Sequence, residues 1–175
     1  MILYSDECGV YLLPFVQTTW AAKGKTPSLW EHCGYEHLSI IGAISPAGNL
    51  VFWCRRCSFD GQATADFLAW TGAHFYRKHK IILIWDGAKI HNSAPVKEYL
   101  IHHPGKIHLE RLPAYSPELN PMELMWAYLK KSMSNQIFLN LDQLEEAVCE
   151  ELTKIKNNRK LVQSFFRKKE IGFFS

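Results

Sequence analysis

The sequence predicts an α/β domain with a mixed sheet of about five strands flanked by helices. Extended segments and a hairpin come first in the chain, and apolar strands then alternate with helical segments, which is the order expected of this class. The length, 175 residues, suits one domain with a hydrophobic core large enough to fold without disulfide or metal staples.

Local patterns predict each element in order along the chain. Short apolar runs predict strands, and Pro46-Ala47-Gly48 is a tight-turn signal that joins two of them into a hairpin. The expected strands are residues 1–5, 37–45, 49–58, 81–85 and 107–112, with a further candidate strand at 10–16. Apolar residues at helical spacing predict the helices, and a stretch without clean periodicity predicts a long loop. These are helices 62–79, 94–102, 121–134 and 141–156, and loop 18–35.

The charge, the apolar runs and the cysteines of the chain limit the class of protein to which it can belong. A net charge of +3 permits nucleic-acid binding without requiring it. No apolar run approaches the roughly 20 residues that span a bilayer and no secretion signal opens the chain, so we expect a cytoplasmic protein with no membrane partner. The five cysteines are expected to be free thiols. Cys54 and Cys57 lie three apart on an expected strand, so they point to opposite faces and are not expected to form a zinc half-site.

Two carboxylates follow apolar strands. Asp6 comes directly after the expected strand 1–5, and Asp86 follows the buried strand 81–85, where Gly87 lets the chain turn away. Sites in open α/β sheets lie outside the carboxyl ends of parallel strands, and side chains on neighbouring strands are about 5 Å apart. Two carboxylates at that distance repel each other and favour a hard cation between them. The pattern therefore predicts a metal-binding pair if the two strands are neighbours.

A third acid, Glu123, lies in the first turn of an expected helix. Asn120 is a good N-cap, Pro121 occupies the favoured first helical position, and Glu123 stands three residues after the cap. Two interpretations follow from these residues alone. Glu123 closes a capping box with Asn120, or it projects from the end of the helix toward a metal at the edge of the sheet.

Four sequence blocks resemble the catalytic domain of DDE transposases of the mariner superfamily, in the bacterial insertion-sequence branch. The most specific block ends in Asn-Pro-x-Glu at Glu123, and another begins with Asp86 and has His91 five positions later. Thirty-six residues separate Asp86 from Glu123, which is near the spacing of that branch. The matching blocks are residues 5–9, 20–27, 86–93 and 112–126.

The resemblance implies a ribonuclease H-like fold and an enzyme that cuts and joins DNA strands. It implies that Asp6, Asp86 and Glu123 are the catalytic residues and the metal ligands. Two Mg²⁺ ions, or Mn²⁺, are the implied cofactors, and no covalent protein intermediate is implied. We expect residues 1–135 to form the catalytic core and 136–175 to form a C-terminal helical segment with a basic and aromatic tail, packed on the core or extending from it.

Three residues near the expected acids have other interpretations. Gly87 stands where many relatives carry Asn, a departure that we expect the site to tolerate. Glu7 neighbours Asp6 but faces the opposite side of a strand, so we interpret it as a supporting residue rather than a ligand. Three roles are open for His91. It contacts a phosphate, it orients the carboxylates without being a ligand itself, or it makes local hydrogen bonds at the start of a helix.

Basic side chains are the expected DNA contacts, and the candidates are Lys23, Lys25, His91, Lys130 and Lys131. The implied partners are double-stranded DNA, both element ends and target, and a second copy of the chain in a homodimer. The first acid is at position 6, which leaves no room for a DNA-binding module before it. We therefore expect that a separate helix-turn-helix polypeptide supplies this module, or that the chain is a truncated copy. We expect a bacterial protein associated with the nucleoid. Two other functions stay open, a ribonuclease H-like nuclease without transposition and an inactive or domesticated remnant that only binds DNA or dimerises.

Overall fold

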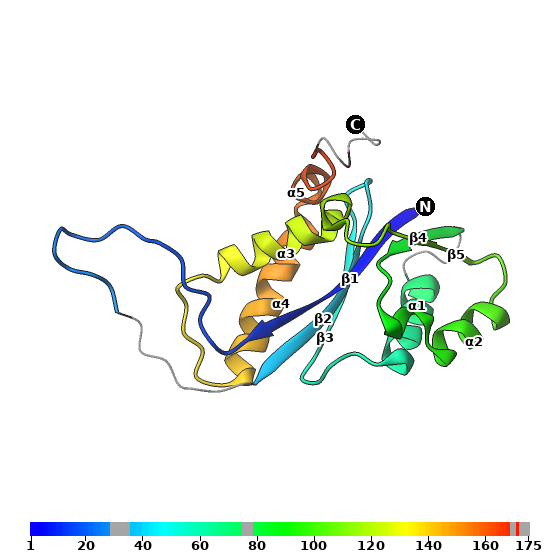
Figure 1. Ribbon diagram of the computed structural model, residues 1–175, viewed down its shortest axis with the longest axis horizontal. Coiled ribbons are helices and arrows are strands. Elements are labelled where there is room, and N and C mark those ends of the chain that lie inside the picture. Colours follow the sequence, from blue (N-terminus) through cyan, green and yellow to red (C-terminus); the bar gives the residue numbers. More distant parts are fainter. Residues whose placement is uncertain (29–35, 75–78, 169–170, 172–175) are drawn as a thin grey trace.

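A five-stranded mixed sheet with helices on both faces forms the centre of the molecule (Figure 1). The computed structural model describes residues 1–28, 36–74, 79–168 and 171. The strands are β1 (Ile2–Tyr11), β2 (His37–Ile44), β3 (Leu50–Arg55), β4 (Ile81–Trp85) and β5 (Ile107–Arg111). Their order across the sheet is β3-β2-β1-β4-β5. β2 is antiparallel to β1 and β3, whereas β4 is parallel to β1 and β5.

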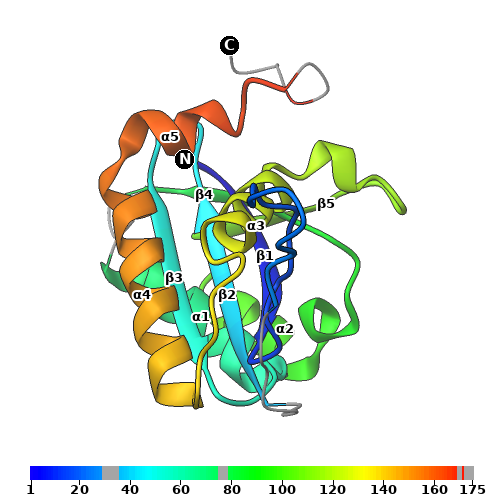
Figure 2. The same ribbon diagram turned by 90° about the vertical axis from the view of Figure 1, so that its left-hand side faces the viewer.

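Helices cover the two faces of the sheet and enclose a separate hydrophobic core on each (Figure 2). The helices of the first face are α1 (Gly61–His74) and α2 (Ala94–His102). Those of the second face are α3 (Pro121–Ser132), α4 (Leu141–Asn157) and α5 (Arg159–Ser164). Within the described residues, no helix is both long enough and apolar enough to cross a membrane.

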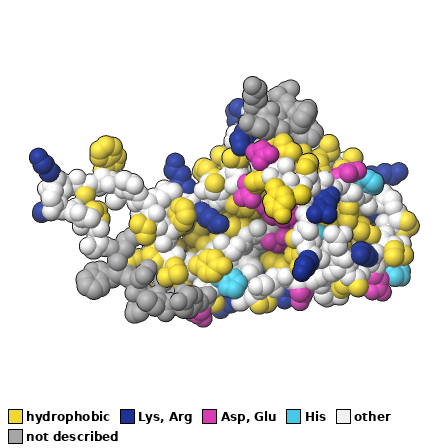
Figure 3. Space-filling view, viewed as in Figure 1, with side chains coloured by type: hydrophobic (Ala, Val, Ile, Leu, Met, Phe, Trp, Pro, Cys, Tyr) yellow, Lys and Arg dark blue, Asp and Glu magenta, His cyan; other side chains and the backbone are white. Residues whose placement is uncertain are grey.

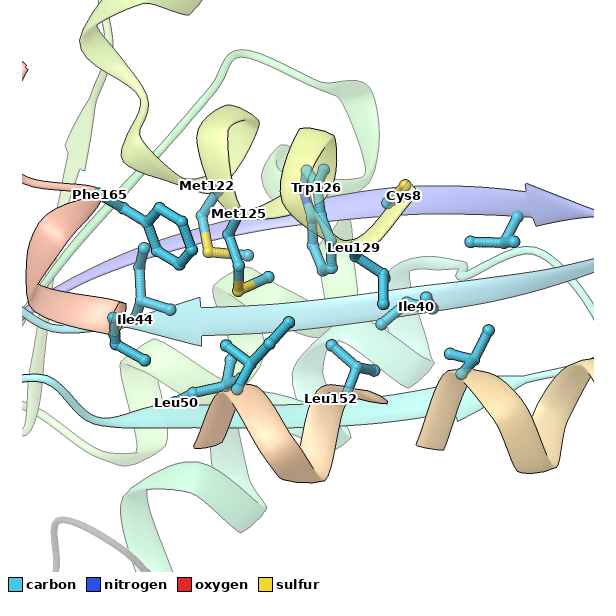
Figure 4. Close-up of a cluster of buried hydrophobic side chains, with 14 of the residues drawn as sticks. Cys8, Ile40, Ile44, Leu50, Met122, Met125, Trp126, Leu129, Leu152 and Phe165 are labelled. Carbon is cyan, nitrogen blue, oxygen red and sulfur yellow. The ribbon is translucent and has the colours of Figure 1, made fainter. Parts of the chain in front are cut away.

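β2 is buried on both faces because its apolar side chains alternate between the two cores. Ile40 and Ile44 belong to the core beneath α3 and α4, whereas Ile41 and Ala43 belong to the core beneath α1 and α2. Figure 4 shows the first of these cores, where side chains from β1, β2 and β3 meet those of α3 and α4. The central strands are thus fixed in register from both sides.

α3 packs tightly against β2 at Gly42. A Cβ atom at Gly42 would lie 3.2 Å from Met122 Cε and 3.2 Å from Trp126 Cη2, which is closer than ordinary van der Waals contact. The missing side chain therefore lets α3, the helix that carries Glu123, lie directly on the sheet.

β1 is longer than the sequence predicts, and the prediction of a separate strand at 10–16 is wrong. β1 is one strand of ten residues, and the chain beyond it has no strand structure up to residue 16. As far as Tyr4 it pairs in parallel with β4, and from Tyr4 to Tyr11 it pairs antiparallel with β2. Asp6 therefore lies inside a strand, although just beyond the end of the parallel pairing.

The other predicted elements are confirmed with small changes at their ends. α2 has the predicted bounds, and α1 is confirmed as far as His74, while residues 75–78 of the prediction lie outside the described residues. β3 ends at Arg55 rather than at residue 58, and α3 ends at Ser132. Of the expected loop, residues 29–35 also lie outside the described part.

The expectation that Cys54 and Cys57 lie on one strand is wrong, because β3 ends at Arg55. Cys54 is half-buried on β3, and the Cys149 thiol of α4 donates to its sulfur at 3.9 Å. Cys57 is exposed beyond the end of β3. The two cysteines of the motif thus face different surroundings.

Candidate active site

Asp6 projects from β1 toward the start of α3. Its Oδ1 accepts a hydrogen bond from the Glu7 backbone N–H at 2.9 Å. Its Oδ2 accepts from Asn120 Nδ2 at 3.1 Å and from the indole Nε1 of Trp126 at 3.2 Å. Donors at the start of α3 and one turn further on therefore set the orientation of this carboxylate.

Asp86 is the first residue after β4, and its carboxylate is half exposed. Its Oδ1 accepts from the Ala88 backbone N–H at 2.9 Å and lies 3.0 Å from His91 Nδ1. A short 3₁₀ helix, η1 (Lys89–Asn92), follows and brings the histidine back to the aspartate. The carboxylate is thus held from one side and open on the other.

Glu123 does not close the capping box that its position in the sequence allows. Asn120 caps α3, because its Oδ1 accepts from the Met122 backbone N–H at 3.1 Å. The Asn120 backbone N–H, which a capping box would give to the glutamate, donates instead to Pro117 O at 3.0 Å. Glu123 is exposed, and its carboxylate has no hydrogen bond or ion pair among the described residues. It is therefore available as a ligand.

The three carboxylates of Asp6, Asp86 and Glu123 line one cavity of about 370 Å³. Figure 3 shows acidic side chains gathered near the middle of this face of the molecule, with basic side chains beside them. The rest of the cavity wall comes from Gly87, from Asn120 and from residues 111–117, which lead from β5 toward α3. The sheet edge and the first turn of α3 thus bring together acids that are far apart in the sequence.

The donor set of the cavity fits a hard divalent cation. Among the described residues, no three His, Cys, Asp or Glu side chains are close enough together to cage an ion by themselves. Mg²⁺ does not need such a cage, because it commonly binds one or two carboxylates and keeps several water ligands. Three carboxylates around an open cavity provide oxygen ligands of this kind.

Electrostatics at Asp6 also favour a cation. Burial, followed by the negative charge of Glu7, raises the pKa of Asp6 to about 7. The charges of Glu123 and Asp86 raise it further, and the hydrogen bond from the Glu7 backbone lowers it. A nearby cation would offset these effects and favour the ionised carboxylate.

His91 lies behind the carboxylates and is only 2% exposed. Its Nε2 lies 3.0 Å from Glu7 Oε1, and its ring stacks on Trp85 with 4.0 Å between ring centroids. Burial lowers the pKa of His91, but the hydrogen bond and charge of Glu7, with a smaller effect of Asp86, raise it above its ordinary value. The ring therefore links Glu7 to Asp86 and is covered from solvent, and its predicted contact with DNA stays a prediction.

Residues 1–145 match the family model of the DDE superfamily endonucleases. The chain belongs to this family. A relative from Sinorhizobium fredii, protein y4pE/y4sA, is 31% identical over 122 residues, which cover 66% of this chain and 83% of the relative. The 39 kDa protein of insertion element IS630 from Shigella sonnei is 25% identical over 133 residues, which cover 76% of this chain and 38% of that protein.

Solved structures of the mariner transposase Mos1 share the fold of this DDE endonuclease. The catalytic domain of Mos1 matches with a TM-score of 0.67 and 16% identity, over 99% of this chain and 81% of that one. The Mos1 paired-end complex with Mg matches with a TM-score of 0.75 and 16% identity, over 99% of this chain and 53% of that one. The predicted ribonuclease H-like fold is confirmed, and the chain spans about half of the longer Mos1 chains.

The four lysines predicted to contact DNA lie outside the acidic cavity of the endonuclease. Lys23 and Lys25 are exposed on the segment after β1, which extends away from the sheet (Figure 1). Lys130 and Lys131 lie in the last turn of α3, and Lys130 lines a small apolar pocket instead. Their role in DNA binding stays a prediction.

Sequence reasoning missed three side chains of the site. Trp126 and Asn120 hold Asp6, whereas the sequence assigns no role to Trp126 and predicts Asn120 only as a helix cap. Arg111 lines the cavity beside the carboxylates. Its place at the end of strand 107–112, at the same sheet edge as Asp86, is the signal that could have identified it.

Proposed function

We propose that this chain is the catalytic domain of a transposase that cuts DNA strands and joins the resulting 3′-hydroxyl ends to a target. The observation that carries the proposal is that Asp6, Asp86 and Glu123, from β1, the end of β4 and the start of α3, line one cavity in a DDE superfamily endonuclease. The similarity to the Mos1 strand transfer complex and to a protein of insertion element IS630 supports the assignment.

Divalent metal ions, Mg²⁺ or Mn²⁺, are the cofactors of the proposed reaction. The Mos1 structures include complexes with Mg and with Mn, which supports this choice. Asp6, Asp86 and Glu123 would hold the two ions. When bound, such ions stabilise the attacking and leaving oxygens of an in-line displacement at phosphorus.

The protein side chains prepare the site in three ways. Asn120 and Trp126 hold Asp6 in place, so that one helix fixes a carboxylate on the neighbouring strand. His91 holds Asp86 from behind. Glu123 has no partner among the described residues and can turn toward the cavity as the substrate enters. The proposed nucleophile is a water molecule in cleavage and a DNA 3′-hydroxyl in joining.

Double-stranded DNA, comprising element ends and target, is the proposed substrate. The Mos1 structures are paired-end and strand-transfer complexes, which supports a protein that acts on two DNA ends at once. We propose that the chain acts as a homodimer on paired ends. Since it spans 38% of the IS630 protein, end recognition is proposed to come from a helix-turn-helix module on a further segment or a separate polypeptide.

A cleavage and strand-transfer assay tests the proposal. The purified chain is incubated with Mg²⁺ and a labelled duplex that carries an element end, with and without the helix-turn-helix polypeptide. Asp86→Asn and Glu123→Gln should abolish cleavage, whereas the matched changes Asp66→Asn on α1 and Glu118→Gln, which lie outside the cavity, should not.

Each outcome of this assay distinguishes the candidate functions. Cleavage followed by joining supports the transposase. Cleavage without joining supports a ribonuclease H-like nuclease that does not transpose, and DNA binding without cleavage supports an inactive remnant. Retained cleavage by the folded Asp86→Asn variant would overturn the assignment of the carboxylates.

A further inference from the structure

Arg111 is a basic residue on the wall of the acidic cavity to which the proposed reaction assigns no role. It is the last residue of β5 and pairs across the sheet with Trp85, the residue before Asp86. The parallel pairing of β4 and β5 therefore places its side chain at the same sheet edge as Asp86. It lines the cavity together with Asp86 and Glu123.

The guanidinium of Arg111 occupies the space beside the backbone of Gly87. A Cβ atom built on Gly87 would lie 2.5 Å from Arg111 Nε and would overlap Cζ and Nη2. A side chain at position 87 would therefore displace the guanidinium. Glycine at this position leaves the room that the arginine occupies.

Arg111 is exposed, and its side chain makes no ion pair or hydrogen bond with the residues that the structure describes. It lies on a cavity with three carboxylates and engages none of them, so its N–H donors remain free for a ligand. A guanidinium keeps its charge at every physiological pH, and its planar fork matches two oxygens of one phosphate.

We propose that Arg111 binds the non-bridging oxygens of a DNA phosphate in this cavity, next to the phosphodiester that is cut. The inference rests on the proposed function, because it takes the cavity to be the place where the DNA strand enters. The three carboxylates repel a phosphate until divalent ions offset their charge. Arg111 is a fixed cation of the same cavity, and it would hold the strand in register beside the reacting group.

A salt titration of DNA binding tests the contact. Fluorescence anisotropy with a dye-labelled DNA duplex gives the binding constant K of the full chain over a range of salt concentrations, with Ca²⁺ as the divalent ion. Loss of one phosphate contact should lower the steepness of log K against log salt concentration by about 0.9. We expect this change for Arg111→Ala and a similar change for Gly87→Asn, which displaces the guanidinium.

The two changes should not add, because both remove the same contact. The double variant should therefore match Arg111→Ala, Arg111→Lys should keep most of the salt dependence, and Lys97→Ala, an exposed residue of α2 outside the cavity, should resemble the wild type. All variants are expected to fold, because the three atoms nearest to a Cβ at position 87 all belong to the movable end of Arg111. Thermal unfolding checks this.

An unchanged salt dependence for the folded Arg111→Ala variant would overturn the inference, and so would additive effects of the two changes. These failures differ from a failure of the proposed function. A chain that cuts and joins DNA but shows no effect of Arg111 would retain the function and lose this contact. A chain that shows the salt effect but never cuts DNA would retain the phosphate contact and lose the proposed function.

Discussion

At the scale of single residues, the site is held together by polar side chains that are not themselves ligands. His91 lies between Glu7 and Asp86 and stacks on Trp85. Residues that orient ligating carboxylates in this way affect activity nearly as much as the ligands themselves. The buried histidine is therefore a positioning residue for Asp86.

Replacing His91 tests this role. His91→Phe keeps a ring that can stack on Trp85 but removes both nitrogen atoms, so Asp86 loses a partner and Glu7 is left unpaired. We expect a 10–100-fold loss of DNA cleavage, in the range typical of outer-shell partners of metal ligands, measured as the initial rate with Mg²⁺. His108→Phe is the control, because the side chain of His108 is 71% exposed on β5. Equal rates for His91→Phe and the wild type would show that Asp86 needs no such support.

Asp6 gives a second prediction at this scale, which concerns pH. The pKa of Asp6 in the folded protein is about 7, above its ordinary value. Between about pH 4 and pH 7 the folded protein holds a proton that the unfolded chain has lost, so the stability of the metal-free protein falls as pH rises through this window. Bound Mg²⁺ favours the ionised form, and Mg²⁺ should therefore raise the melting temperature more at about pH 8 than at about pH 5.5.

Thermal unfolding with and without Mg²⁺ at the two pH values measures this effect. Asp6→Asn removes the titrating group, so the metal-free variant should lose the part of the pH dependence that Asp6 causes. A rise in melting temperature with Mg²⁺ that is the same at both pH values would contradict the coupling between the proton and the ion.

At the scale of elements, α3 is the helix on which the site depends. It carries Glu123, it presents Trp126 to Asp6, and it is capped by Asn120, which also donates to Asp6. Its apolar residues pack on β2 (Figure 4), and the absence of a side chain at Gly42 leaves room for them. The spacing between helix and sheet therefore sets the position of the carboxylates relative to each other.

A methyl group at Gly42 should disturb this spacing. Gly42→Ala places a Cβ atom 3.2 Å from Met122 and from the ring of Trp126, so these two side chains of α3 have to move by a few tenths of an ångström. We expect a loss of about 1–3 kcal/mol in the free energy of unfolding in urea, together with slower DNA cleavage, because Trp126 moves. Gly9→Ala on β1 is the matched control, since its Cβ atom would meet the Tyr11 ring at an ordinary 3.5 Å. An unchanged rate of DNA cleavage in Gly42→Ala would show that the site does not depend on how α3 packs against β2.

The elements also show what the sequence could and could not predict. Helices α1 to α4 and strand β4 follow from local periodicity, whereas α5 was not predicted, and the predicted acids Asp6, Asp86 and Glu123 do line one cavity. The full length of β1 could not be predicted, because Asp6 and Glu7 are poor strand formers that are held in the strand by pairing with β2. The open choice for Glu123 was likewise decided by the hydrogen bond from the Asn120 backbone to Pro117, which local sequence does not reveal.

At the scale of the whole molecule, one of the two cores runs across the boundary predicted at residues 135 and 136. It joins Tyr4 of β1 and Leu38 of β2 to Leu152 of α4, and then to Phe165 and Phe166 after α5. The described part of the C-terminal segment contributes buried side chains to this core. Phe166 makes an edge contact with Tyr4, with ring centroids 5.7 Å apart. The end of the chain therefore supports the strand that carries Asp6.

Removing the Phe166 ring should destabilise the whole domain. The side chain is 4% exposed, and loss of a buried phenyl ring costs about 3–5 kcal/mol through the lost burial and the cavity that remains. This is a large part of the stability of a domain of this size, so Phe166→Ala should unfold at much lower urea concentration than the wild type. Ile101→Ala is the control, because Ile101 is 75% exposed on α2 and its loss should change stability by less than about 0.5 kcal/mol. If Phe166→Ala unfolds at the same urea concentration as Ile101→Ala, the C-terminal segment does not belong to the cooperative unit. If Phe166→Ala instead unfolds in a single transition at lower urea concentration, residues on both sides of the predicted boundary fold together. The stability of β1, and with it the position of Asp6, then depends on the C-terminal segment as well as on the rest of the core.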